Sequence, residues 1–147
     1  MERVILIRYG EIGLKGKNRR MFENTLVANL ERVLRGLPVK VNRTRERILL
    51  EPNDQAPGGP LAEAWDESEI YARLSLVFGV VSFSPVIKTR PEMETIQIAA
   101  ATLLQESGAR TFKVESRRAD KEFPIPSPEI SRLLGAVLLR NFPGVRV

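Results

Sequence analysis

The 147-residue sequence contains no cysteine and no histidine. The absence of cysteine excludes disulfides and thiolate nucleophiles, and the absence of histidine excludes every His-based catalytic triad. Together the two absences remove the usual ligands of protein zinc sites. Few enzyme classes therefore remain for this chain on its own.

Long hydrophobic runs are also absent. No run of about eighteen apolar residues occurs, so we expect no transmembrane helix. The N-terminus carries Glu2 and Arg8 within the span that a signal peptide keeps apolar. We therefore expect a cytoplasmic protein without membrane contact. With 43% apolar and 28% charged residues, the chain has an ordinary composition for one domain or two small ones.

The net charge of +5 is unevenly distributed. Residues 1–20 contain six bases and two acids, and residues 35–50 contain five bases and one acid, so each segment carries a net charge of +4. Residues 53–72 contain five acids and no base. Segregated positive charge favours a polyanionic partner, with nucleic acid as the first choice.

The first ninety residues show strand and helix patterns in the order βαββαβ, which is typical of a ferredoxin-like fold. Strands are predicted at 3–9, 39–42, 48–51 and 80–89, and amphipathic helices from about 18 to 34 and from about 66 to Gly79. The second helix is expected to bury Ile70, Leu74, Val77 and Phe78. Pro85 places the last strand at a sheet edge or makes it a bend between two sheets.

Residues 65–69 predict the start of the second helix. Asp66 and Glu69 have the spacing of a capping box. Trp65, directly before them, is expected to pack as a hydrophobic staple onto Ile70, with stacking on RNA as the alternative.

From Pro91 onward, helix and strand patterns alternate strictly, which implies parallel strands with right-handed crossovers. Helices are predicted at 91–107 and from Pro128 to about 141, with a strand from Thr111 between them and another strand beginning at 145–147. Because the chain stops on entering a strand, we expect it to continue beyond Val147. The fold class predicted for the whole chain is α+β to α/β.

The segment 111–128, T-F-K-V-E-S-R-R-A-D-K-E-F-P-I-P-S-P, predicts one anion site. A strand runs into a basic turn, and Ser127 is expected to cap a helix whose first residue is Pro128. The carboxyl end of a strand beside a helix N-terminus is where open α/β sheets bind anions. The alternative is a solvated loop in which Glu115 and Asp120 pair with the arginines.

A second candidate surface surrounds the start of the first helix, in the segment G-E-I-G-L-K-G-K-N-R-R. Cations there lie at the positive end of the helix dipole, which is mildly unfavourable unless a phosphate binds between them. The alternative is that they are exposed and tolerated. Together with the basic hairpin at 43–47, the predicted RNA-binding residues are Lys15, Lys17, Asn18, Arg19, Arg20, Arg43, Arg45, Lys113, Arg117, Arg118 and Lys121.

Two passages resemble the N-terminal half of the tRNA 4-thiouridine sulfurtransferases, a family also counted among thiamine-biosynthesis proteins. They are R-Y-G-E-I-G-L-K-G-K-N-R-R-M-F-E at 8–23 and F-K-V-E-S-R-R-A-D-K-E-F-P at 112–124, followed by S-P-E-I. The resemblance implies a ferredoxin-like domain at 1–79, a closing strand at about 80–89 shared with or leading into the next domain, and a C-terminally incomplete THUMP RNA-binding domain at 80–147. It also implies that the two domains hold tRNA by the acceptor stem and 3′ CCA end.

The family's catalytic part has no counterpart in this sequence. Family members continue into an ATP-pyrophosphatase domain with an S-G-G-x-D-S phosphate loop, where ATP activates a tRNA uridine for attack by persulfide sulfur. This chain has neither that loop nor a cysteine, so we expect no cofactor on it, no catalytic residue and no thiolation by it alone. For the parent enzyme the resemblance implies a cysteine desulfurase as sulfur source, and it admits a homodimer.

Two other functions stay open at this point. The chain could be the THUMP module of another tRNA-modifying enzyme, a methyltransferase or a deaminase, although the segment G-E-I-G-L-K-G-K-N-R-R resembles the sulfurtransferase group. It could also be a ferredoxin-like interaction domain that binds no RNA, because a fold alone does not fix a function.

Overall fold

The computed structural model describes residues 2–10, 17–44, 47–53 and 66–147. The chain divides into two compact units, an N-terminal unit of Arg3–Val86 and a C-terminal unit that contains Ile87–Val147. No helix in the described ranges is long and apolar enough to cross a membrane.

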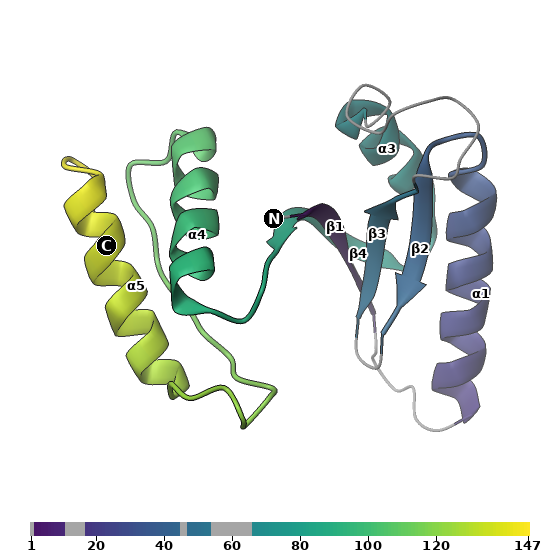
Figure 1. Ribbon diagram of the computed structural model, residues 1–147. Coiled ribbons are helices and arrows are strands. Elements are labelled where there is room, and N and C mark those ends of the chain that lie inside the picture. The colour runs from purple at the N-terminus through teal and green to yellow at the C-terminus, as the bar shows by residue number, and fades with distance from the viewer. Residues whose placement is uncertain (1, 11–16, 45–46, 54–65) are drawn as a thin grey trace. The chain divides into compact units, whose positions relative to one another are not determined.

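The described residues of the N-terminal unit form a four-stranded sheet and two helices (Figure 1). Its elements in chain order are β1 (Glu2–Tyr9), α1 (Lys17–Val33), β2 (Val39–Arg43), β3 (Ile48–Pro52), α3 (Glu67–Leu74) and β4 (Val80–Lys88). The strands lie in the order β2-β3-β1-β4, and β3 pairs antiparallel with both β1 and β2. The predicted ferredoxin-like order is confirmed, and the strand that contains Pro85 lies at an edge of the sheet.

One hydrophobic core joins α1 and α3 to the same face of the sheet. Its buried residues recur at every second position in the strands and at every third or fourth position in the helices. They are Ile5, Ile7, Leu26, Leu30, Leu34, Ile48, Leu50, Ile70, Leu74 and Val77. One half of the predicted capping box is confirmed, because the Asp66 carboxylate accepts the Glu69 N–H at 3.3 Å, whereas the Glu69 carboxylate accepts Arg73 Nε at 2.9 Å. Trp65, the predicted staple, lies outside the described residues.

Phe78 does not belong to this core, so its predicted burial is wrong. α3 ends at Leu74, and the chain continues in turns closed by i→i−3 hydrogen bonds, such as that from Val77 N–H to the Leu74 carbonyl at 3.1 Å. These tighter turns break the helical period. Val77 stays buried, whereas the Phe78 side chain is 91% exposed.

The C-terminal unit packs two helices, α4 (Met93–Ser107) and α5 (Ser127–Asn141), side by side (Figure 1). Leu104 of α4 and Leu134 and Leu138 of α5 form its buried cluster. Gly108 ends α4 in the left-handed conformation, with φ of 63°, as expected for the glycine after the last helical residue.

The segment 111–116 is extended, but it is not the strand that we predicted. Its exposure alternates as expected, and Phe112 and Val114 pack against the buried cluster. Within the described ranges, its strand-type pairing is limited to a parallel bridge between Thr111 and Arg146. A strand requires a neighbour that takes its hydrogen bonds in succession. Among the described residues, Arg146 alone accepts a backbone N–H of this segment, from Phe112 at 2.9 Å, so no succession of such bonds forms.

Ser127 does not cap α5, contrary to the prediction. The helix begins at Ser127 itself, and Pro126 stands in the cap position without a side-chain hydrogen bond. Ser127 Oγ instead accepts the backbone N–H of Arg118 at 3.0 Å. The serine therefore fastens the basic loop to the helix instead of closing the helix end.

Candidate nucleic-acid interface

The first basic surface, called the α1 surface, consists of Asn18, Arg19, Arg20 and Glu23 of α1 and Arg43 at the end of β2. Arg19 Nε donates to Glu23 Oε1 at 3.0 Å. Arg43 Nη1 lies 4.0 Å from Glu23 Oε2 and donates to Asn24 Oδ1 at 2.6 Å. The fold thus brings together two predicted arginines that are far apart in sequence, because β2 packs beside α1.

Glu23 is the centre of this surface, and Tyr9 holds it from the sheet side. Tyr9 Oη donates to Glu23 Oε1 at 2.7 Å. This hydrogen bond, with Arg19 and Arg43 nearby, lowers the pKa of Glu23 against the opposing effect of burial. Burial and the carboxylate raise the pKa of Tyr9. At neutral pH the pair is therefore a phenol donating to a charged carboxylate, a strong class of hydrogen bond.

The preorganised guanidinium groups are the feature of this surface that bears on phosphate binding, which stays a prediction. Guanidinium groups held by a carboxylate on one side lose less conformational freedom when a second anion binds on the other. Asn18 and Arg20 are exposed in the first turn of α1, and Arg20 has no ion-pair partner among the described residues. The surface therefore combines Arg19 and Arg43, which side-chain hydrogen bonds hold in place, with the exposed Arg20.

Replacing Glu23 with Gln is expected to weaken tRNA binding by about threefold to tenfold, or about 0.7 to 1.4 kcal/mol. If Glu23 merely offset positive charge, its neutralisation would strengthen binding to a polyanion. If Glu23 positions Arg19 and Arg43, binding weakens, because the Gln side chain replaces one acceptor oxygen with an NH₂ donor that cannot bind a guanidinium group. Equilibrium titration of labelled tRNA distinguishes the two signs.

The matched control is Glu31→Gln, which removes the same charge from an exposed position of the same helix. It should leave affinity unchanged or raise it slightly. Tyr9→Phe removes one hydrogen bond to Glu23 without changing the charge, and it should shift affinity in the same direction as Glu23→Gln. Tighter tRNA binding by Glu23→Gln would contradict the positioning role.

The second basic surface, called the 116–123 loop, lies in the C-terminal unit. Hydrogen bonds fasten it at three places. Ser131 Oγ donates to Ser116 Oγ at 2.8 Å, Arg118 N–H donates to Ser127 Oγ at 3.0 Å, and Arg118 Nη1 donates to the Phe123 carbonyl at 2.9 Å. Arg118 is therefore partly occupied by structural contacts.

Arg117 and Lys121 of this loop are exposed. The proposed pairing of Glu115 and Asp120 with the arginines is not found in the described part of the chain. Glu115 instead pairs with Lys113 at 2.5 Å, and an Asp120 carboxylate oxygen accepts the Glu122 N–H at 2.9 Å. The loop thus keeps its outer cations available to an anion.

A hollow of about 300 Å³ lies against this loop. The charged residues of its lining are Arg117, Arg118 and Asp120, and Ile96, Phe123 and Ile130 are among the apolar ones. The lining thus combines apolar side chains with two guanidinium groups and one carboxylate, a mixture compatible with a flat apolar group that carries an anionic substituent.

The other predicted contacts are placed less completely. Lys113 is exposed, and its ammonium group is held by Glu115, which raises the pKa of Lys113. Lys15 and Arg45 lie outside the described residues, and Lys17 is described only as the first residue of α1. Their RNA-binding roles stay predictions.

Sequence reasoning missed the residues that organise these surfaces. Glu23 follows Arg19 by four positions, the spacing of a helical ion pair, and this spacing was the available signal. Tyr9 and Asn24 carry no such signal, because only the packing of α1 against the sheet brings them to Glu23 and Arg43.

Each of the two units matches a known domain family. Residues 4–84, more than half of the chain, match the ThiI ferredoxin-like domain family. The chain belongs to this family. Residues 91–147 match the THUMP domain, so this ThiI-family chain combines a ferredoxin-like and a THUMP domain.

The ThiI-family chain is 43% identical over 152 residues to a probable tRNA sulfurtransferase of Acetivibrio thermocellus. The match covers the whole of this chain and 37% of that relative. It is 43% identical over 144 residues to the Moorella thermoacetica protein of the same name, covering 97% of the chain and 34% of the relative. It thus spans about a third of these relatives.

Two solved structures are similar to the chain. One is a 4-thiouridine synthetase in complex with RNA and bound ATP, with a TM-score of 0.75 and 34% identity over 99% of this chain and 35% of that one. The other is PH1313 from Pyrococcus horikoshii, with a TM-score of 0.73 and 30% identity over 98% of this chain and 46% of that one.

Proposed function

We propose that this chain is the tRNA-binding module of a tRNA sulfurtransferase. The observation that carries the proposal is the 116–123 loop, which is fastened to α5 and keeps exposed cations beside an apolar hollow. The names of its relatives and the RNA complex of one solved relative support the same function. The match to a ThiI ferredoxin-like domain favours a sulfurtransferase over a methyltransferase or deaminase with a THUMP domain.

The proposed ligand is the acceptor stem with its 3′ CCA end. A phosphate backbone suits the arginines of the α1 surface, and an unpaired terminal nucleotide suits the hollow beside Arg117. These contacts position an RNA and do not by themselves read its sequence.

The chemistry is assigned to the rest of the parent protein, of which this chain corresponds to about a third. ATP and persulfide sulfur delivered by a cysteine desulfurase would be used there, in the cytoplasm. The homodimer of the parent protein stays a prediction.

The test compares three labelled ligands of similar length: intact tRNA, the same tRNA without its CCA end, and duplex DNA. We expect intact tRNA to bind at least about tenfold more tightly than either of the others, a difference of about 1.4 kcal/mol. Arg117→Glu should reduce the difference between intact and truncated tRNA, whereas Arg140→Glu, an exposed reversal in the last turn of α5, should preserve it. Equal affinity for all three ligands would overturn the proposal.

A further inference from the structure

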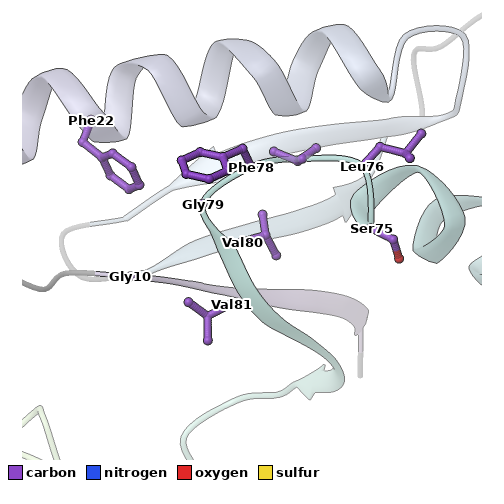
Figure 2. A pocket seen from close by; sticks show the side chains of 9 residues that line it. Gly10, Phe22, Ser75, Leu76, Phe78, Gly79, Val80 and Val81 are labelled. Carbon is purple, nitrogen blue, oxygen red and sulfur yellow. The ribbon is translucent and has the colours of Figure 1, made fainter.

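An apolar hollow of about 750 Å³ lies in the N-terminal unit, between α1 and the turn that joins α3 to β4 (Figure 2). Its residues include Leu76, Phe78 and Val81, whose side chains are 79%, 91% and 72% exposed. Phe22 of α1 also lines it, and Figure 2 labels both Phe22 and Phe78 among the side chains of the lining. None of the three exposed side chains contributes to the core of this unit.

The turn that carries Phe78 is fixed by its surroundings. Gly79 has φ of +97°, and a Cβ atom there would lie 3.0 Å from the Phe22 ring. Gly10 N–H donates to the Gly79 carbonyl at 3.3 Å, which ties the turn to the end of β1. The turn's backbone is therefore constrained on both sides of Phe78's neighbour Gly79, while the Phe78 side chain is exposed. Contiguous exposed apolar side chains of this kind usually mark a contact surface.

The hollow adjoins the α1 surface through a chain of contacts. The Phe22 ring, which lines the hollow, lies 6.0 Å from the Tyr9 ring. Tyr9 donates to Glu23, and Glu23 holds Arg19. An apolar aromatic recess thus borders a cluster of guanidinium groups.

We propose that this hollow takes an unpaired nucleobase of the RNA whose phosphates the α1 surface binds. The inference rests on the proposed function and extends it to a second contact of a different kind. Single-stranded nucleic acid is typically bound by a cationic path for the backbone with aromatic rings on which bases stack. A purely apolar protein partner would leave the charges of the adjoining arginines without a counterpart.

The lining also determines how the base is read. Ser75 is the one residue with a polar side chain among those found to line the hollow, and its Oγ donates to the Tyr71 carbonyl at 2.9 Å. Recognition of base edges requires several placed donors and acceptors. The hollow therefore takes a base by stacking and apolar contact, with little preference among the four bases.

The test uses a hairpin RNA with an unpaired 3′ tail and the same hairpin with a blunt end. Phe78→Ala should weaken binding of the tailed RNA by about fivefold to a hundredfold, the range for loss of one stacked base. Binding of the blunt hairpin should change by less than about twofold. The salt dependence should be unchanged, because Phe78 contacts no phosphate.

Three variants sharpen the result. Phe78→Trp should retain tail binding, whereas Phe78→Leu, which keeps apolar area but not a ring, should lose most of it. Ile98→Ala, at a position that is 51% exposed in α4, is the matched control for removing an exposed apolar side chain. With 2-aminopurine placed at each tail position in turn, one position should show stacking in the wild type that is lost in Phe78→Ala, whereas any stacking in the hollow beside Arg117 should persist.

The outcomes separate this inference from the proposed function. If Phe78→Ala binds the tailed RNA as tightly as the wild type does, the inference is wrong and the proposed tRNA binding stands. A change in sedimentation with RNA affinity intact also overturns it, because the hollow is then a protein interface. Failure of the wild type to bind either RNA overturns the proposed function itself.

Discussion

Raising the salt concentration from 50 to 200 mM is expected to weaken tRNA binding by about a hundredfold to a few thousandfold. The expectation follows from roughly five to eight phosphate contacts and a log–log slope of about −3.5 to −6 for single-stranded or end-like RNA. The structure favours the shallower end of this range. Arg19 and Lys113 already pair with Glu23 and Glu115, so each releases less than a full counterion. Fluorescence anisotropy at five or more salt concentrations measures the slope.

Single substitutions give this slope an internal check. Removing the charge of Arg20 or Arg117 should make the slope shallower by about 0.7, the value for one phosphate contact on a single strand. Arg32→Gln, at an exposed position in the last turn of α1, should leave it unchanged. A flat response in the wild type would mean that apolar contacts hold the RNA and that the basic surfaces do not bind phosphate.

The fold of the N-terminal unit was predictable because each element carries its own periodicity. The helical spacing of Leu26, Leu30 and Leu34 and the position of Pro85 are local signals, and they sufficed for the element order and for the edge strand. The basic segments could also be found from the sequence, because counting charged residues along the chain requires no knowledge of the fold.

The failures occur where a local pattern depends on a distant partner. Phe78 continues the helical spacing of α3, but the chain leaves the helix after Leu74, and no residue pattern marks that departure. Segment 111–116 has the alternation of a strand, although pairing requires a neighbour outside the segment. The Ser127 hydroxyl was expected to accept a backbone N–H of the helix. It does accept a backbone N–H, but the donor is Arg118 of the loop.

Charge reversal in each basic surface should separately reduce tRNA affinity by well over tenfold, more than about 1.4 kcal/mol. In the N-terminal unit the change is Arg19→Glu with Arg20→Glu. In the C-terminal unit the corresponding change is Arg117→Glu with Arg118→Glu. Because Arg118 also donates to the Phe123 carbonyl, this pair removes a structural contact as well as charge. Arg117→Glu with Lys121→Glu is the cleaner pair, because both side chains are exposed and no partner for either is found in the described part of the chain.

Matched double reversals separate a local contact from a general loss of positive charge. Arg32→Glu with Arg35→Glu changes the charge by the same amount at the far end of α1, and Arg110→Glu with Arg140→Glu does so at exposed positions of the C-terminal unit. These controls should lose affinity by less than about threefold, since exposed charges beyond a Debye length of about 8 Å act weakly. Thermal unfolding of every variant verifies that it is folded. If the Arg117 and Lys121 pair binds like its control while the Arg19 and Arg20 pair does not, the 116–123 loop is not an RNA contact, and the α1 surface alone carries the binding.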